Sequence, residues 1–355
     1  MKTVTIKDVA ARAGVSPKTV SRVINGEDHV RPEVRDAVQR VVAELDYRPN
    51  AFARSLSSSR SYLLGLFIDD PVSGYAADVQ HGALLRCRER SYHLVVEPVD
   101  LARDGWAEQV RDSIAALRLD GAVIAPPICD EQVLVDIFVD SGLPHVLMAP
   151  SVEPPLSGAV RMDDHGAALE MTAYLIGLGH RRIGFVQGPV AHSASLRREE
   201  GFRAAMAAAG IMVDDRWIVR GDFSFRSGLE LGDRLLAEGE RPTAIFACND
   251  DMALGVLITA MKHGIAVPDV LSVCGFDDAA SSRAAWPQIT TIRQPKAEMA
   301  SSAVDILVNP EFRRRSASPG FHLMLPHSLI VRGSTGPCAE PQDGDRISGI
   351  VWWRE

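Results

Sequence analysis

From residue 62 onward, short apolar runs alternate with amphipathic segments over about 270 residues. This alternation restricts the fold most strongly, because strands that alternate with helices form open parallel sheets with helices on both faces. The apolar runs predict strands at Leu63–Ile68, His93–Val96, Gly121–Ala125, His145–Met148, Ile183–Gln187, Ala244–Ala247 and Ser272–Gly275. The amphipathic segments predict helices at Ala77–Glu89, Glu108–Leu117, Ala168–Leu178, Glu199–Ala209 and Met252–His263. We therefore expect an α/β body of doubly wound parallel sheets.

The stretch from Thr5 to Gly26 shows a different pattern, that of two short helices around a tight turn. Apolar residues recur at positions 6, 9, 10 and 13, which is the stripe of an amphipathic helix. Gly14 can end this helix in a left-handed turn, because glycine adopts that conformation without steric cost. Ser16 is placed to cap a second helix, and Pro17 fits its first turn, where no backbone N–H is needed.

The second helix has an apolar inner stripe and a polar, basic outer side formed by Lys18, Thr19, Ser21 and Arg22. A third helix is expected after Pro32, where apolar residues repeat at 34, 37, 38, 41 and 45. Three such helices match the helix-turn-helix pattern, whose second helix enters the DNA major groove. The alternative is an ordinary helical subdomain with solvated charges.

The charge distribution favours DNA binding at one end of the chain. The 355 residues have a net charge of −8, but residues 1–60 carry 11 basic and 7 acidic side chains. The remainder carries 27 basic and 39 acidic side chains. A basic head on an acidic body is typical of a protein that meets DNA phosphates only through the head.

Metal, cofactor and catalytic motifs are missing from the sequence, so we expect no metal, no cofactor and no enzymatic activity. The five cysteines form no C-x-x-C pair, which argues against a zinc site or a disulfide framework. The glycines at 177 and 179 follow a helix and do not complete a dinucleotide-binding G-x-G-x-x-G. Neither a signal peptide nor an apolar run of about 20 residues is present, so a cytoplasmic location is expected.

The wording of the first 56 residues resembles a known family. The pattern T-I-K-D-V-A-x-x-A-G-V-S-x-x-T-V-S-R-V-I-N-G, followed by Tyr47–Asn50 and Ala53–Leu56, is similar to the N-terminal signature of the LacI/GalR (lactose-repressor) family. The similarity extends to about Gly336. It implies a homodimeric transcriptional regulator that binds operator DNA and a small-molecule effector.

The resemblance also implies which residues meet DNA. We expect residues 1–48 to form the helix-turn-helix domain, in which Lys18 and Arg22 contact base edges and Pro17 offers an apolar contact. Residues 49–61 would be a hinge helix and linker, with Leu56 wedged into the minor groove. A plain linker is the alternative there. The expected DNA-binding set is Thr5, Ser16, Pro17, Lys18, Thr19, Ser21, Arg22, Asn25, Asn50, Ala53 and Leu56.

The body is expected to be two-lobed and to resemble periplasmic sugar-binding proteins. Its pattern nearly restarts around Arg161, and Thr290–Pro295 matches the family's crossover to the first lobe. We expect a first lobe of residues 62–160 and 293–322 and a second lobe of residues 161–292 and 323–332. We assign no function to the tail, residues 333–355.

Polar residues at strand ends are the candidates for the effector site, because ligands bind at the carboxyl ends of strands in such sheets. Carboxylates and amides there suit sugar hydroxyls, although Asn and Asp also cap helices. The resemblance implies five effector-binding residues: Asp163, Arg198, Phe223, Asn249 and Asp277. One departure is Ala149, which stands where many family members carry an aspartate.

We therefore expect a repressor of carbohydrate-use genes whose effector is a sugar. A purine-responsive regulator is one alternative. A solute-binding protein for sugar uptake is another, but it would need a signal peptide and would not need residues 1–60.

Overall fold

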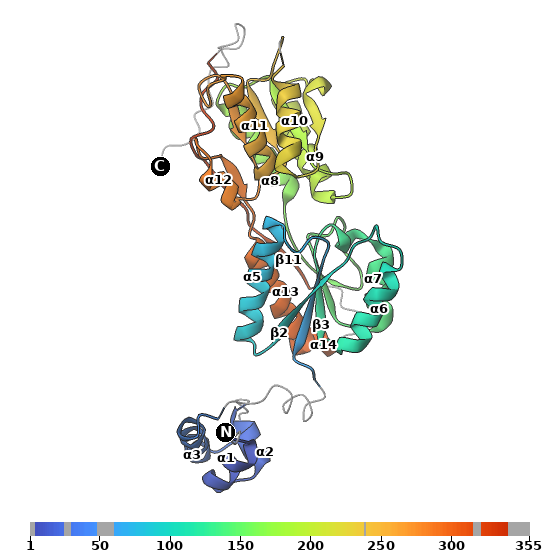
Figure 1. The fold of residues 1–355 in the computed structure, drawn as a ribbon, viewed down its shortest axis with the longest axis vertical. Coiled ribbons are helices and arrows are strands. Elements are labelled where there is room, and N and C mark those ends of the chain that lie inside the picture. The colour runs from blue at the N-terminus through green and yellow to red at the C-terminus, as the bar shows by residue number, and fades with distance from the viewer. Residues whose placement is uncertain (1–3, 25–29, 48–59, 238, 315–320, 340–355) are drawn as a thin grey trace. The chain divides into compact units, whose positions relative to one another are not determined.

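The computed structural model describes residues 4–24, 30–47, 60–237, 239–314 and 321–339. The chain forms two compact units, Met1–Tyr62 and Leu63–Glu355. Figure 1 shows the first unit as a group of helices and the second as a body of two lobes, each built on a sheet with helices around it. The predicted class, an all-α head with an α/β body of parallel sheets, is confirmed.

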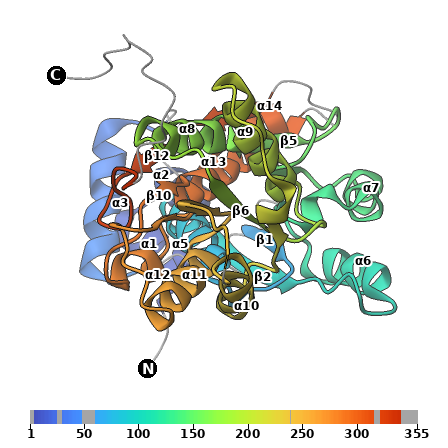
Figure 2. The same cartoon turned by 90° about the horizontal axis from the view of Figure 1, so that it is seen from above.

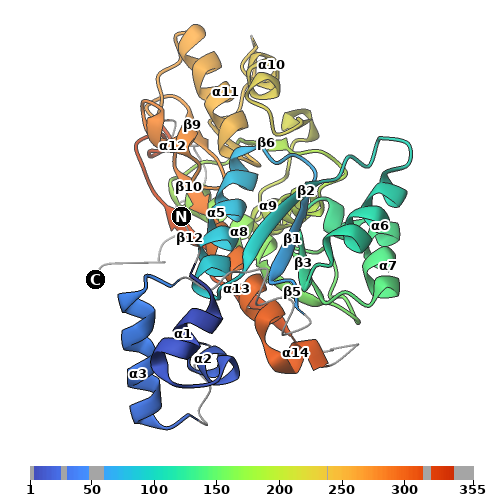
Figure 3. The same cartoon turned by 60° about the horizontal axis from the view of Figure 1, so that its bottom comes forward.

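The helical unit consists of α1 (Ile6–Ala13), α2 (Pro17–Ile24) and α3 (Pro32–Glu44), shown in blue in Figure 3. Gly14 ends α1 with a φ of +66°, in the left-handed region expected for it. The hydroxyl of Ser16 caps α2 by accepting a hydrogen bond from the Thr19 backbone N–H at 3.1 Å. The apolar stripes pack into one core of Val9, Ala10, Val20, Val23, Val38, Val41 and Tyr47.

The first lobe contains a six-stranded parallel sheet in the order β11-β5-β4-β3-β1-β2. Its strands are β1 (Leu63–Ile68), β2 (His93–Pro98), β3 (Gly121–Ile124), β4 (His145–Met148), β5 (Gly158–Met162) and β11 (His322–Leu325). Helices α5 (Gly74–Glu89) and α13 (Lys296–Val308) pack together on one face, and α6 (Trp106–Leu117) and α7 (Gln132–Ser141) cover the other (Figures 1 and 2). The short helices η1 (Ile128–Asp130) and α14 (Pro310–Arg314) complete this lobe.

The second lobe contains a four-stranded parallel sheet in the order β7-β6-β8-β9. Its strands are β6 (Ile183–Gln187), β7 (Ile218–Arg220), β8 (Ala244–Ala247) and β9 (Ser272–Cys274). Figure 2 shows α8 (Asp164–Gly177) and α9 (Ser193–Ala208) on one side of β6, with α10 (Phe225–Leu235) and α11 (Asp250–Lys262) on the other. Two short helices, η2 (Asp215–Trp217) and α12 (Ala280–Ala284), complete this lobe.

Two short strands carry the chain between the lobes. Strands β10 (Thr291–Arg293) and β12 (Ser328–Ile330) pair in antiparallel fashion, with Ile292 opposite Leu329. The third connection is the short segment between β5 and α8. The polar residues at the carboxyl ends of the strands of both sheets can therefore face one cleft.

We expected the segment Leu323–Leu329 to return directly to the second lobe, but it does not. Its first part belongs to β11, which pairs with β5 through Leu323 opposite Val160 and so extends the edge of the first-lobe sheet. The reason is that hydrogen-bond pairing with the open edge of β5 satisfies the backbone of this segment before it leaves the lobe. The expected boundary at residue 323 was therefore placed too early.

The residues directly after 332 also differ from the expectation. The backbone N–H of Val273 donates to the Ser334 carbonyl at 2.8 Å, and that of Cys338 donates to the Leu178 carbonyl at 2.8 Å. Ser334 is fully buried. Residues 333–338 are thus part of the second lobe rather than of a tail beginning at residue 333, and residues 340–355 lie outside the described part.

Among the described residues, no helix combines the length and the apolar character needed to cross a membrane. The same residues contain no group of three or more His, Cys, Asp or Glu side chains arranged to hold a metal ion.

Candidate functional site

Helix α2 of the helical unit has one buried and one exposed face. Val20 and Val23 are buried, whereas Lys18 and Arg22 are exposed. Six of the expected DNA-binding residues, Ser16, Pro17, Lys18, Thr19, Ser21 and Arg22, lie on this helix or at its N-cap. The exposed surface of α2 is therefore basic and rich in hydroxyl groups, which suits contact with bases and phosphates.

Some expected DNA-binding groups already have protein partners. Thr5 donates its backbone N–H at 2.8 Å and its hydroxyl at 2.7 Å to the Asp8 carboxylate at the start of α1. The hydroxyls of Ser16 and Thr19 bond to one another at 2.9 Å. These contacts order the helix starts before DNA is met. Four other expected residues, Asn25, Asn50, Ala53 and Leu56, lie outside the described part of the chain.

In the second lobe, Arg198 of α9 is the most thoroughly held of the expected effector-binding residues. Its Nε and Nη2 each lie 2.9 Å from Asp164 Oδ1, and its Nη1 donates to the Cys248 carbonyl at 2.6 Å. Its guanidinium carbon lies 3.7 Å from the centre of the Phe276 ring. Although burial disfavours its charge, the carboxylates of Asp164 and Asp277 raise the pKa of Arg198 above its ordinary value. Arg198 therefore holds a fixed positive charge beside Asp164, at the carboxyl end of β8.

Asp277 follows β9 and lies beside that charge. Its backbone N–H donates to the Ile292 carbonyl at 2.8 Å, and its carboxylate accepts a hydrogen bond from Gln294. Its φ of +118° is a strained conformation for a residue with a side chain. Burial raises the pKa of Asp277, while Lys296 and Arg198 counteract that rise. The second carboxylate oxygen of Asp277 can accept hydrogen bonds from a ligand.

Asn249 and Asp163 act as helix caps. The Oδ1 of Asn249 accepts from the Met252 N–H at 2.9 Å, and its Nδ2 donates to the Phe223 carbonyl at 2.8 Å. Asp163 accepts from the Gly166 N–H at 2.8 Å at the start of α8. These two side chains therefore cap helices, which is the alternative to ligand binding that the sequence left open. Any effector contact by them stays a prediction.

The aromatic ring of Phe223 is held against Gly188, directly after β6. Phe223 has a φ of +67°, and its ring lies so close to Gly188 that a Cβ at that position would be 2.3 Å from the ring. The ring meets His192 edge-on, with the two ring centres 5.1 Å apart. The Asn249 bond to its carbonyl fixes the same loop, so the structure orients this ring through backbone and packing contacts together.

The first lobe contributes residues that the sequence did not indicate. Tyr75 begins α5 close to second-lobe groups, because Asp164, Asp277 and Arg198 all act electrostatically on its hydroxyl. Lys296 lies 5.9 Å from the centre of the Tyr75 ring. Its ammonium group pairs with Asp78 at 2.7 Å. Burial raises the pKa of Tyr75, so its hydroxyl stays protonated at neutral pH.

A cavity of about 280 Å³ lies next to these residues, between the lobes. From the first lobe it is lined by Ala149, Pro150, Ser151, Arg161, Met162 and Met324, and from the second by Asp163, Asp164, His165, Ser193, Ala194 and Arg197. Its walls come from two lobes that are joined by only three connections. Opening or closing of the lobes would therefore change this space.

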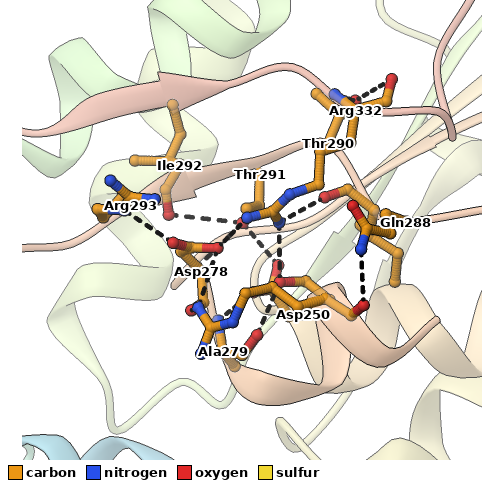
Figure 4. Close-up of polar contacts among 12 residues, drawn as sticks. Asp250, Asp278, Ala279, Gln288, Thr290, Thr291, Ile292, Arg293 and Arg332 are labelled. Carbon is orange, nitrogen blue, oxygen red and sulfur yellow. Dashed lines mark hydrogen bonds and ion pairs between the residues drawn. The ribbon is translucent and has the colours of Figure 1, made fainter.

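Asp278, directly after Asp277, binds the connections between the lobes. Its carboxylate is only 5% exposed and accepts from Arg293 Nε at 2.7 Å and from Arg332 (Figure 4). Arg283 lies 3.3 Å from the same carboxylate. Burial alone would raise the pKa of Asp278, but Arg332 and Arg293 outweigh it and lower that pKa. Both neighbouring aspartates therefore bond to the crossover, Asp277 through Gln294 and Asp278 through Arg293 and Arg332.

Asp250, at the start of α11, lies beneath the same crossover. It accepts hydrogen bonds from the Ala279 N–H at 2.7 Å and from the Thr291 hydroxyl at 2.6 Å (Figure 4). The side chain is fully buried. Burial, followed by repulsion from Asp277, raises the pKa of Asp250 from 3.8 to about 8. Asp250 and Asp278 therefore belong to one polar network around the crossover, joined through the Thr291 hydroxyl.

Comparison with known proteins agrees with both parts of this arrangement. Residues 5–50 match the model of "Bacterial regulatory proteins, lacI family", and residues 172–335 match a "Periplasmic binding protein-like domain". Catabolite control protein A of Priestia megaterium is 33% identical over 336 residues, which cover 94% of this chain and 99% of that protein.

Two solved structures extend the likeness to the whole architecture. The lac repressor dimer bound to operator and the anti-inducer ONPF matches with a TM-score of 0.77 and 28% identity, over 94% of this chain and 100% of that one. The complex of the transcriptional regulator CelR with cellobiose matches with a TM-score of 0.71 and 30% identity, over 93% and 99% of the two chains.

Proposed function

The chain belongs to the lacI family of bacterial regulatory proteins, and we propose that it is a homodimeric repressor of carbohydrate-use genes controlled by a sugar. Members of this family are transcriptional regulators rather than enzymes. The observation that carries the proposal is the buried Arg198–Asp164 pair, whose aspartate lines the cavity between the two lobes of a chain whose other unit is a helix-turn-helix. A charged, hydrogen-bonding cleft coupled to a DNA-binding head is the arrangement of a ligand-controlled switch.

The exposed face of α2 is the proposed reader of operator DNA. Arg22 can donate two hydrogen bonds to guanine, and Lys18 can contact a neighbouring base. The hydroxyls at the start of α2 suit phosphates, because the N-terminal end of a helix favours negative charge. The helical unit would then place α2 in the major groove.

The proposed homodimer is supported by apolar residues left exposed on the second lobe. Ile258 and Met261 lie three positions apart on α11 and are 41% and 58% exposed, and Trp286 is 85% exposed. Residues three positions apart share one face of a helix, and an exposed apolar pair of this kind favours association. A twofold dimer requires a palindromic operator, because each helical unit reads one half-site.

The proposed sugar class rests on the residues of the cleft. Asp277 supplies an acceptor for hydroxyl groups, and Phe223 offers a ring face on which a sugar ring can stack. The matched CelR structure is a complex with cellobiose. This chain shares its overall architecture, so a carbohydrate is the first ligand class to test.

Selection of binding sites from a pool of random DNA duplexes tests the proposal. The full-length protein should enrich a short palindrome, and its affinity should fall steeply with salt, because binding releases counterions from phosphates. Recovery of no common sequence, or affinity that does not change with salt, would contradict the proposal.

A further inference from the structure

We propose that the apolar segment formed by residues 347–353 docks on the second lobe of its own chain. The docking site is a groove between the loop after α8 and the loop after α9, which we call the α8–α9 groove. The segment lies outside the described residues, whereas both loops lie within them. The groove is at the amino ends of β6 and β7, opposite the carboxyl ends at which we place the effector. The proposal therefore assigns a partner to a second surface of the body.

The α8–α9 groove has a volume of about 510 Å³ and a partly apolar lining. Ile211, Met212 and Val213 supply that lining from the loop after α9, together with Trp217 of η2. Met212 is 92% exposed, the largest fraction among the exposed large apolar side chains of the described residues. Covering such a side chain with another apolar group is favourable, because it removes apolar surface from water.

The described part of the chain leads to this groove. The backbone N–H of Cys338 donates to the Leu178 carbonyl at 2.8 Å, and a Cβ at Gly179 would lie 3.6 Å from the Cβ of Cys338. Arg181, which lines the groove, follows Gly179 by two residues, a span of at most about 7 Å. Residue 338 is therefore anchored next to the rim of the groove.

The chain between that anchor and the apolar segment is long enough to cross the groove. Residues 339–346 span up to about 27 Å when they are extended. A flexible tether this short keeps the segment at an effective concentration of roughly the millimolar range. Docking on the segment's own second lobe is therefore favoured over docking on a separate copy, whose concentration in solution is lower.

The composition of the segment suits an apolar groove. Five of its seven residues are large and apolar, namely Ile347, Ile350, Val351, Trp352 and Trp353. A tryptophan buries roughly 150–250 Å² when it is covered, so two in succession offer a large contact area. The residues on either side of the segment are charged, which confines the apolar contact to residues 347–353.

The charges of the connecting chain and of the groove are complementary. Residues 340–346 contain three acidic side chains and one basic side chain. Arg181 and Arg182 place positive charge at the groove. The groove's own aspartates, Asp214 and Asp215, are paired with other arginines of this lobe. The acidic connection therefore passes a basic rim on its way to the groove, and opposite charges favour that approach.

Limited proteolysis of the full-length protein tests the docking. Chymotrypsin cleaves after tryptophan, and a docked segment is cleaved only when it leaves the groove. The rate of cleavage at Trp352 and Trp353, followed by mass spectrometry, therefore reports the undocked fraction. Met212→Asp places a charge in the apolar lining and should speed this cleavage at least about tenfold. Val72→Asp makes the same change at an 89% exposed residue of the first lobe and should keep the wild-type rate. Equal rates in wild type and Met212→Asp overturn the inference.

Hydrogen exchange tests the same contact from the side of the groove. The double variant Trp352→Asp with Trp353→Asp removes the two largest apolar side chains of the segment. The amides of residues 211–217 should then exchange at least about threefold faster than in wild type, because docking no longer protects that loop. The amides of α7, in the first lobe, should exchange as they do in wild type. Unchanged exchange at residues 211–217 overturns the inference.

A mixing experiment distinguishes the chain's own groove from that of a second copy. Met212→Asp keeps an intact segment, and the double variant keeps an intact groove but lacks the two cleavage sites. With the double variant in roughly tenfold excess, most Met212→Asp segments meet an intact groove on another copy. Their cleavage should nevertheless stay fast. A return to the wild-type rate would show that the segment docks between copies and would overturn the inference.

Discussion

Arg332, in the segment after β12, donates a hydrogen bond to the carboxylate of Asp278 in the loop after β9. This contact ties the last connection between the lobes to the residue next to Asp277, for which we propose a ligand contact. The Arg332 side chain is 11% exposed, and its Nη1 also donates to the Ile289 carbonyl at 3.0 Å. The Arg332–Asp278 pair therefore holds the segment after β12 against the loop after β9.

Loss of Arg332 should destabilise the body. Arg332→Ala leaves a buried carboxylate short of a partner and should lower the free energy of unfolding by about 3 kcal/mol or more. Arg283→Ala removes a 52% exposed partner of the same carboxylate and should cost about 1 kcal/mol or less. Urea denaturation followed by tryptophan fluorescence measures both. Equal losses of unfolding free energy in the two variants would show that buried Arg332 stabilises the protein no more than exposed Arg283 does.

The stability of the protein should depend on pH through Asp250. Its pKa is about 8 in the folded protein against an ordinary 3.8, so between these values the folded state holds a proton that the unfolded chain has lost. Asp250 therefore lowers the free energy of unfolding as pH rises through this range. The variant Asp250→Asn lacks this pH dependence. The free energy of unfolding of the variant minus that of wild type should therefore increase with pH, by up to about 1.4 kcal/mol per pH unit. Urea denaturation at pH 5, 6, 7 and 8 checks this, and a constant difference would contradict it.

The base contact proposed for Arg22 can be measured on the selected operator. Arg22→Ala should cost about 1–3 kcal/mol of binding free energy and relax the preference at one base pair in each half-site. Arg40→Ala, which removes an exposed arginine from α3, is the matched control and should leave that preference intact. If Arg22→Ala kept the wild-type affinity and the wild-type preferred sequence, α2 would not be the reading helix.

Leu56 lies outside the described residues, and its role as a minor-groove wedge stays a prediction. Leu56→Ala should weaken operator binding and reduce the bend of the DNA, because an apolar wedge between base steps kinks the duplex. Effector affinity should not change. Gel mobility of circularly permuted operator fragments measures the bend, and a normal bend would make residues 49–61 a plain linker.

The part of the fold that sequence reasoning predicted is the part with continuous apolar runs. Strands such as β1 and β8 are almost entirely apolar and buried, so their pattern is plain. By contrast, β5, β7 and β10 carry Arg161, Arg220 and Arg293, and the last two strands have three residues each. Strands this short are fixed by pairing with a neighbour, which local pattern does not reveal.

Sequence reasoning named candidate effector-binding residues in the second lobe only. Arg198, Phe223 and Asp277 were named from family resemblance, and the structure places them at the carboxyl ends of second-lobe strands or in contact with the loops there. Tyr75 was not named, because only the fold brings α5 of the first lobe near Asp164 and Arg198 of the second. Spacing along one chain does not encode that approach.

The central claim is that ligand in the cleft controls operator affinity. Its most direct test is titration of the selected operator by wild type and Asp277→Ala, with and without a saturating sugar that binds wild type. Because linkage is reciprocal, the sugar should change wild-type operator affinity by the same factor as operator changes sugar affinity. For Asp277→Ala the same sugar concentration should leave operator affinity unchanged. A wild-type operator affinity that is indifferent to bound sugar, or a full response in Asp277→Ala, would contradict the account.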